Sequence, residues 1–555
     1  MALHLPSISE LRNTQAELQR FRQRVTTMQA VMVVCFLLLL SRLIYLQVLE
    51  HEDLLEQAEN NRTAVLPTVP PRGAILDRNG VVLASNYSAY TLEITPSRVA
   101  DLEATIQALS EIVEIQPRDR KRFKRLREES KSFDSLPIRT RLSEEEVARF
   151  SAQRYRFPGV EIKARLFRQY PYGELASHVI GYIGRINARE KERIDEEDED
   201  GNYRGTEYIG KLGVEQSYER ELHGTTGVQE VETSAGGRAI RRLSSRPAVP
   251  GKNVVLSIDI KLQKLVEDLY GPRRGALVAL DPNTGEVLAF VSKPTFDPNL
   301  FVEGIDVESW QTLNESIDKP LLNRALRGTY PPGSTYKPFM ALGALTTGKR
   351  SASTIIHDAG SWTYGGHTFR SHGDHGLGAV DMVRSIVLSS NVYYYSLAND
   401  MGVDAIHDFM KPLGFGQITG IDLPGEVRGV LPSTEWKRKT YKRPEQQKWY
   451  GGETISLGIG QGYNTFTMLQ LATATSVLAN GGIKNVPHVV RATQDALNHQ
   501  EHPKPKPEPL PLGYKPEHLS VVRNGLVGVT TGGTSAQVFA GAGYTSAGKT
   551  GTAQA

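Results

Sequence analysis

The chain has 555 residues, a formal net charge of +3 and a mean hydropathy of −0.34. At roughly 150 residues per domain, this length predicts three or four units rather than one core. The mild charge, without a basic stripe carrying interleaved aromatic residues, gives no support to nucleic-acid binding, and we predict no nucleic-acid partner. The one cysteine, Cys35, excludes an intrachain disulfide.

An apolar segment lies at residues 28–49, with an unbroken apolar core from Val31 to Leu40. A helix of about 20 residues spans the roughly 30 Å hydrocarbon layer of a membrane. Arginines precede the segment and carboxylates follow it, a bias that places the N-terminus in the cytoplasm. We therefore predict a cytoplasmic tail at 1–27, an uncleaved anchor at 28–49 and an exported remainder. A cleaved signal peptide is the alternative, but no small-x-small cleavage pattern follows the apolar core.

Residues 50–250 predict a first exported domain, in which short apolar runs alternate with turns. Dense charge between Pro117 and Val147 predicts solvated helices. A partner-binding head is the alternative interpretation of the same segment.

A second domain is predicted over residues 251–555. Ala276–Phe290 is typical of a β-hairpin around an Asn-Thr-Gly turn, and helical patterns fill much of residues 334–478. Prolines alternate with other residues from His502 to Pro509, which predicts an extended surface loop without a core of its own.

Ser334 and Lys337 form a Ser-x-x-Lys pattern after Pro-Pro-Gly. Residues three apart share one helical face, so the lysine amine can lie beside the serine hydroxyl, which needs an adjacent base to act as a nucleophile. Serine is a good N-cap, so we expect Ser334 to open a helix with Pro338 in its first turn. Taken alone, the triplet is more typical of a capped surface helix than of a catalytic site.

Two further motifs follow in order. Ser389-Ser390-Asn391 comes after a helix-like stretch, Val380–Leu388, and Lys549-Thr550-Gly551-Thr552 comes near the end of the sequence. Ser-x-x-Lys, Ser-Asp-Asn and Lys-Thr-Gly in this order are the signature of penicillin-binding proteins and class A β-lactamases. Ser390 stands in place of the aspartate, but both outer positions are kept. The three motifs together predict a serine acyl-transfer site.

The chain resembles the class B penicillin-binding proteins over nearly its whole length, and is most like the penicillin-binding protein 2 type of cell elongation. The division-specific penicillin-binding protein 3 is the nearest rival. Besides the three motifs, the resemblance is carried by residues 72–80, 170–182, 210–227 and 322–334. No stretch resembles the glycosyltransferase domain of the class A relatives.

The resemblance implies an α+β fold with three parts. These are the transmembrane helix, an elongated pedestal of the dimerisation type with its head at residues 50–250, and a transpeptidase domain with an antiparallel sheet and helices at residues 251–555. In this family the Lys-Thr-Gly strand is followed by two more strands and a helix. We therefore expect a transpeptidase domain that is incomplete at its C-terminus and an active-site strand without its main partner.

The activity implied by the resemblance is D,D-transpeptidation, which cross-links peptidoglycan stem peptides through a serine acyl-enzyme during elongation and rod-shape maintenance. β-Lactams would acylate the same serine. The implied catalytic roles are Ser334 as nucleophile, Lys337 as general base, Ser389 as proton relay and Asn391 as the holder of Lys337 and the substrate amide. The implied carboxylate-binding segment is Lys549, Thr550, Gly551 and Thr552, with the N–H groups of Ser334 and Thr552 as the oxyanion hole.

The resemblance also implies an inner-membrane protein with a periplasmic catalytic domain and no cofactor. Its implied partners are a SEDS-family glycosyltransferase and other membrane proteins of the elongation machinery. Three alternatives stay open: a D,D-carboxypeptidase that uses water as the acceptor, a β-lactam sensor, and a catalytically inert scaffold.

Five acidic and histidine residues lie close together before Ser389 and are weighed as a candidate metal site. Zinc accepts such ligands, but the spacing matches no tight ligand template and includes no cysteine, so we predict no metal. The five residues are Asp358, His367, His372, Asp374 and His375.

Overall fold

The computed structural model describes residues 14–54, 63–129, 135–197, 201–233, 239–371 and 375–553. It divides into two units, which are described separately. The first comprises residues 1–68 and 226–248, and the second comprises residues 69–225 and 249–555.

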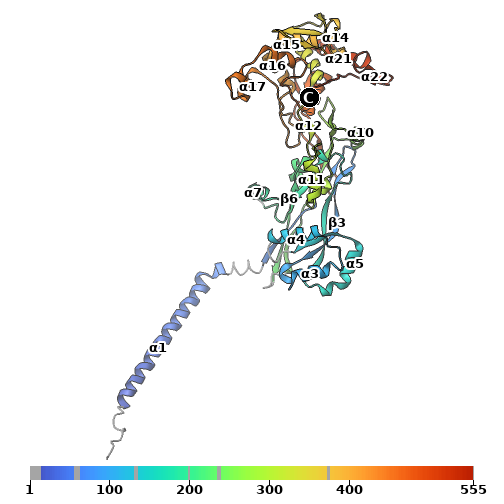
Figure 1. The fold of residues 1–555 in the computed structure, drawn as a ribbon. Coiled ribbons are helices and arrows are strands. Elements are labelled where there is room, and N and C mark those ends of the chain that lie inside the picture. Colours follow the sequence, from blue (N-terminus) through green and yellow to red (C-terminus); the bar gives the residue numbers. More distant parts are fainter. Residues whose placement is uncertain are drawn as a thin grey trace, which may run out of the picture. The chain divides into compact units, whose positions relative to one another are not determined.

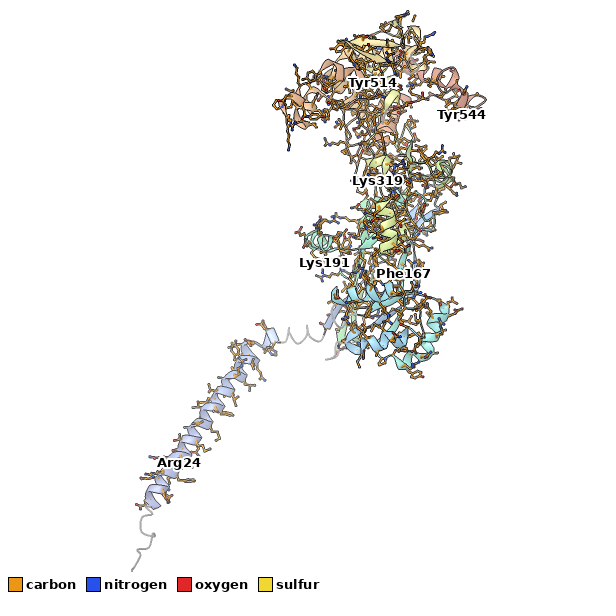
Figure 2. The ribbon with its side chains drawn as sticks, viewed as in Figure 1. Arg24, Phe167, Lys191, Lys319, Tyr514 and Tyr544 are labelled. Carbon is orange, nitrogen blue, oxygen red and sulfur yellow. The ribbon has the colours of Figure 1, made fainter. Side chains whose placement is uncertain are left out.

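The first unit contains a long N-terminal helix and a small sheet. Helix α1, Thr14–Ile44, continues as a π-helix, Tyr45–Leu49 (Figure 1). Over Glu17–Leu49 it is long and apolar enough to cross a membrane once, which agrees with the predicted anchor. The helix starts well before residue 28, so part of the predicted tail is helical, including the polar turns around Arg24 (Figure 2). The sheet is antiparallel with β8 in its centre: β1 Thr63–Thr68, β8 Gly227–Thr233 and β9 Ala239–Arg246.

The second unit is built on a seven-stranded sheet in the order β19-β18-β10-β2-β3-β4, with β5 also paired to β3. All neighbouring strands are antiparallel except β10 and β2. The pairing of β10 with β2 crosses the predicted boundary at residues 250/251, and the proposed domain limits stay a prediction. The bounds are β2 Ile75–Leu76, β3 Val82–Ile94, β4 Leu136–Leu142, β5 Val160–Gln169, β10 Asn253–Leu256, β18 Val490–Gln494 and β19 Glu501–Pro503.

Helices α3, Leu102–Leu109, α4, Pro117–Glu129, and α5, Glu144–Gln153, gather at one end of β3 (Figure 1). The sequence predicts helices here, but not the strand β4 between them. The helices are not fully solvated either, because Phe123 and Leu126 on α4 are buried in a core shared with β3 and β4.

Short elements join this region to the rest of the second unit. The strands β6 and β7 form an antiparallel pair, and α8 and α9 carry two buried carboxylates, Glu215 and Glu219. The bounds are α6 Ser177–Ile180, β6 Ile183–Arg185, α7 Ala188–Glu197, β7 Tyr208–Gly210, α8 Gly213–Ser217 and α9 Glu219–His223.

The catalytic region begins with helix α10, Ile260–Tyr270, and the antiparallel hairpin of β11, Gly275–Leu280, and β12, Val287–Lys293. This hairpin confirms the prediction made for Ala276–Phe290. Three small two-stranded sheets follow along the chain. They are β13 Ile356–Asp358 with β16 Gly378–Val380, β14 Ser361–Tyr364 with β15 His367–Arg370, and β17 Ile483–Lys484 with β20 Leu510–Pro511.

Helix α13, Lys337–Thr346, forms the centre of this region. All its residues from Lys337 to Leu345 are buried, as expected for a helix that is apolar on every side. The surrounding helices contribute to the same core. Their bounds are α11 Val307–Glu315, α12 Arg324–Arg327, α14 Met382–Val387, α15 Asn391–Met401, α16 Val403–Leu413, α17 Thr434–Thr440, α18 Pro444–Gln447, α19 Gly451–Leu457, α20 Met468–Ala479, α21 Pro516–Thr531 and α22 Ala536–Phe539.

The structure corrects two sequence predictions in this region. Residues 502–509 are not a loop throughout, because Glu501–Pro503 pairs with β18 as strand β19. The expected Lys549–Thr552 strand is not formed: residues 545–553 belong to no strand. This segment contacts helix α21 instead, where the N–H of Gly548 donates to the carbonyl of Leu526 at 3.0 Å and the carbonyl of Ser546 accepts from the Thr530 hydroxyl at 2.6 Å.

Candidate active site

Ser334 lies in a tight turn at the entrance to the buried helix α13. Gly333–Tyr336 is a 3-10 turn that leads directly into α13, and Pro338 occupies the first turn of that helix as predicted. Ser334 does not act as the expected N-cap, because it lies inside the 3-10 turn, whose cap position is Pro332. Its hydroxyl is therefore not committed to the backbone of a helix start.

The turn requires glycine at position 333. Gly333 has φ +55°, and a Cβ atom there would lie 2.5 Å from the carbonyl oxygen of Thr552. Its N–H donates to the carbonyl of Gly460, at 3.0 Å. The missing side chain thus allows two distant segments to approach the backbone next to Ser334.

Lys337 is fully buried one helical turn after Ser334. Its Nζ lies 2.7 Å from the carbonyl oxygen of Ser389, 2.7 Å from Asn391 Oδ1 and 3.2 Å from Ser389 Oγ. Burial, reinforced by the positive charge of Lys549, holds the pKa of Lys337 well below its ordinary value, against the opposing effect of Asp358. All three partners are uncharged oxygens that accept from Nζ, so none of them supplies a negative charge that would favour the protonated amine.

The second motif forms the turn between α14 and α15. Ser389 has φ +58°, a strained conformation for a residue with a side chain, and Asn391 is the first residue of α15. Ser390 is the N-cap of α15 and accepts from the N–H of Tyr393 at 3.1 Å. The turn therefore directs Ser389 and Asn391 toward Lys337, while Ser390 points to the other side.

A buried carboxylate holds the back of this turn. The Ser390 hydroxyl donates to Asp358 Oδ2 at 2.5 Å, and both residues are 1% exposed. Asp358 also accepts from the N–H of Gly360, at 2.8 Å. Asp358 supplies a carboxylate where the related motif carries its own aspartate, so it positions the turn from strand β13.

The third motif closes the cluster from a distant part of the chain. Lys549 Nζ donates to Ser389 Oγ at 2.9 Å, and burial lowers the pKa of Lys549 to about 8. Thr550 Oγ1 lies 2.7 Å from Thr534 Oγ1. A Cβ atom on Gly551 would lie 2.8 Å from Thr335 Cγ2 and 3.0 Å from the carbonyl oxygen of Pro332. Only glycine lets this segment lie against the Ser334 turn.

The structure brings all three predicted motifs together, with Lys337 and Lys549 meeting at the Ser389 hydroxyl. One expected contact is not formed: among the described residues no hydrogen bond joins Ser334 Oγ to Lys337. Sequence reasoning missed the roles of Asp358 and Thr534. Nothing in the spacing indicates that residues so far apart in sequence meet at this site.

The candidate metal cluster does not assemble within the described residues. In that part of the chain no group of three or more histidine, cysteine or acidic residues is arranged to hold an ion. Asp358 is occupied by Ser390 and Gly360, and His367 lies exposed on β15 with its ring against Phe369. His372 and Asp374 lie outside the described residues.

Two protein-family profiles match the chain. Residues 275–555 match the penicillin binding protein transpeptidase domain, and residues 67–256 match the penicillin-binding protein dimerisation domain. The peptidoglycan D,D-transpeptidase MrdA of Acinetobacter baumannii is 41% identical, over all of this chain and 81% of the relative. The protein of the same name from Escherichia coli K12 is 40% identical, over 93% of this chain and 81% of the relative. The chain belongs to the penicillin-binding protein 2 family.

Solved structures give the same result. The PBP2 of Pseudomonas aeruginosa is 37% identical with a TM-score of 0.67, and the match covers 89% of this chain and 86% of that one. The PBP2 of Helicobacter pylori in its complex with MreC is 28% identical with a TM-score of 0.75, over 89% of each chain. The α+β fold, the transpeptidase domain and the family predicted from the sequence are confirmed.

Proposed function

We propose that Ser334, Lys337, Ser389 and Asn391 carry the D,D-transpeptidase reaction of this family. The enzyme is a serine-type, penicillin-binding transpeptidase that cross-links peptidoglycan stem peptides. The observation that carries the residue assignment is the burial of Lys337 among neutral oxygens one turn from Ser334, with a second lysine nearby. A lysine in this setting is favoured in its neutral form and can act as a base at neutral pH.

The reaction begins with attack of Ser334 Oγ on the carbonyl carbon of the penultimate D-alanine. Neutral Lys337 takes the hydroxyl proton, after a small reorientation that turns its lone pair toward Ser334. The oxyanion is stabilised by the N–H groups of Ser334 and Thr552, and losing one such donor costs roughly 10²–10³ in rate. The close approach of Thr552 to Gly333 supports this assignment.

Collapse of the tetrahedral intermediate breaks the peptide bond and releases the last D-alanine. Ser389 relays a proton to the leaving amine, because its hydroxyl lies within hydrogen-bonding distance of both Lys337 and Lys549. The amine of a second stem peptide then attacks the acyl-enzyme and loses a proton, and Ser334 regains one. The product is a new amide bond between two stem peptides.

The terminal carboxylate of the donor peptide is assigned to Lys549, Thr550 and Thr552. A cation and two hydroxyls supply the charge-assisted hydrogen bonds that a carboxylate needs. A β-lactam carries a carboxylate in a comparable position, so the same group serves penicillin binding. Gly551 leaves the segment free of a side chain where the substrate backbone would lie.

The N-terminal helix supports single-pass membrane anchoring, and we propose that the catalytic domain lies in the periplasm with the anchor in the inner membrane. The solved Helicobacter pylori relative is in complex with MreC, and another relative belongs to a peptidoglycan synthase complex. We propose corresponding elongation-machinery partners for this chain, including a SEDS-family glycosyltransferase. A phosphatase that needs the periplasm should be active when fused after Thr68, and activity of a cytoplasm-dependent reporter there would contradict the orientation.

Fluorescent penicillin tests the nucleophile. The full chain should be labelled covalently and Ser334→Ala should not be, whereas Ser353→Ala, which alters an exposed serine, should be labelled like the wild type. Undiminished labelling of Ser334→Ala would falsify the assignment. Mass spectrometry of the products formed from stem peptides, with and without an amine acceptor, separates transpeptidation from the carboxypeptidase alternative.

A further inference from the structure

Helices α17 and α18 and the residues that join them carry a concentration of positive charge that the proposed reaction does not use. Residues 428–450 contain seven lysines and arginines but only two carboxylates. Lys439 pairs with Glu435, but among the described residues four exposed cations of this segment form no ion pair. We call these four residues the basic surface: Arg438, Lys442, Arg443 and Lys448.

The basic surface stands on a rigid base. The buried Lys437 donates to both carboxylate oxygens of Glu453, at 2.5 and 2.6 Å, which ties α17 to α19. Its Nζ lies 5.4 to 5.6 Å from the ring centroids of Trp449, Tyr450 and Tyr463. Breaking such a buried pair is costly, so the exposed cations project from a fixed platform.

Two contacts connect this platform to the active site. Helix α19 packs on α15, the helix that begins with Asn391. The loop that follows α19 reaches the nucleophile turn, where the carbonyl of Gly460 accepts the N–H of Gly333. The basic surface therefore belongs to the same rigid assembly as Ser334.

The cross-linking reaction must hold two anionic strands at once. The terminal carboxylate of the donor is assigned to Lys549, whose Nζ donates to Ser389 Oγ, and to the neighbouring threonines. The stem peptides of the acceptor strand also carry carboxylates. Lys549 is already assigned to the donor, so it is not available to bind them. Exposed arginine and lysine side chains that form no ion pair within the described residues are suited to bind carboxylates and to attract them over a distance.

We propose that the basic surface binds the carboxylates of the acceptor peptidoglycan strand and guides that strand toward the acyl-enzyme. This inference rests on the proposed function, because it concerns the second substrate of the same reaction. Charge complementarity favours this ligand, because the surface is positively charged and the acceptor strand carries carboxylates. The surface should favour strands with free carboxylates over strands in which they have been converted to amides, and added salt should weaken binding.

The test compares two triple variants of the full chain in a non-ionic detergent. Arg438→Gln/Lys442→Gln/Arg443→Gln removes three charges from the basic surface. Lys261→Gln/Lys349→Gln/Lys515→Gln removes three exposed positive charges elsewhere in the second unit, and none of these lysines forms an ion pair within the described residues. The probes are soluble, uncross-linked glycan strands with stem peptides and the same strands after amidation.

We expect the basic-surface variant to bind the strands about tenfold more weakly at low salt, and the control variant to bind like the wild type. Amidated strands should bind all three proteins weakly, and roughly 1 M salt should remove the differences. The rate of penicillin acylation should be equal in all three proteins, because penicillin is small and reports on the Ser334 site alone.

Equal strand binding by the two variants, or equal binding of amidated and free strands by the wild type, would overturn the proposal. So would tighter binding of the basic surface to anionic phospholipid vesicles than to strands, which would indicate a membrane contact instead. Failure of the wild-type chain to react with penicillin at Ser334 would contradict the proposed function, and the strand-binding comparison would still be readable by itself.

Discussion

The pedestal and the active site each bury a cluster of charged side chains, but the cluster in the pedestal balances its charge and the cluster in the active site does not. Glu215, which is 0% exposed, accepts from Arg72 Nε and from Arg168 Nε at 2.7 Å each, and Arg72 also reaches Glu219 at 2.7 Å. Burial alone would raise the pKa of Glu215, but Arg168 and Arg72 more than offset it and hold the pKa below its ordinary value.

In the catalytic region the two lysines have no such counter-charge. Within the described residues, neither Lys337 nor Lys549 forms an ion pair, and their hydrogen-bond partners are neutral oxygens. The nearby carboxylate of Asp358 is taken up by Ser390 and Gly360. A balanced buried cluster keeps its charges and ties distant segments together, whereas an unbalanced one releases a proton and thereby creates a base.

The largest effect is expected from removing that base. Lys337→Met should lower the rate of acylation by fluorescent penicillin by about 10²–10⁴-fold, because Ser334 loses its proton acceptor. The matched control is Lys437→Met, which removes another buried lysine that is paired with Glu453. We expect that variant to be less stable but to acylate within about tenfold of the wild type once folded. Equal losses in both variants would mean that Lys337 acts only through packing.

The second prediction concerns the balanced cluster. Glu215→Gln leaves two buried arginines without their shared carboxylate and should lower the free energy of unfolding by about 3–5 kcal/mol, measured by urea denaturation. Asp268→Asn is the control, because its pair with Lys264 is exposed and contributes within about 0.5 kcal/mol. Penicillin acylation by the folded Glu215→Gln protein should be unchanged. If Glu215→Gln is as stable as Asp268→Asn, the buried cluster does not stabilise the contact between the segments that carry Arg72, Arg168 and Glu215.

A third prediction follows from the carboxylate behind the second motif. Ser390→Asp restores the aspartate of the related motif, yet it should destabilise the protein by about 1–3 kcal/mol, because Asp358 already occupies that space. Two buried carboxylates in contact raise the pKa of one of them in the folded state. The folded state then binds more protons than the unfolded state, so stability falls as pH rises from about 4 toward neutrality.

Thermal unfolding at pH 5 and pH 8 measures this effect. Ser390→Ala is the matched variant, since it removes the hydroxyl without adding charge and should show little extra dependence on pH. A Ser390→Asp protein as stable as the wild type at pH 8 would show that Asp358 can turn away from the motif.

These residues also show what the sequence could predict. The apolar run of α1, the Asn-Thr-Gly turn between β11 and β12 and the three short motifs are local patterns, so the apolar helix, the hairpin and the three motifs themselves can be recognised in the sequence. The Asp358–Ser390 contact joins residues 32 apart and depends on tertiary packing, and no local pattern signals it. The N-cap expected at Ser334 failed because the chain forms a 3-10 turn there, in which glycine and close backbone contacts decide the geometry.

The smallest expected effect, and the finest test of the comparison, is the pH dependence of acylation. Lys337 must be neutral and Lys549 must be charged, and burial lowers the pKa of Lys549 to about 8. Acylation should therefore fall on the acid side as Lys337 gains a proton, and fall again above about pH 8 as Lys549 loses one. Lys549→Arg keeps the positive charge at high pH, so the alkaline limb should move to higher pH, by more than one pH unit, while the acid limb stays in place.

Rates of penicillin acylation between pH 5 and pH 10 measure both limbs. An alkaline limb that does not move would show that it belongs to another group and that the charge of Lys549 does not limit the reaction. Movement of the acid limb alone would mean that the two lysines are coupled differently from the arrangement around Ser389.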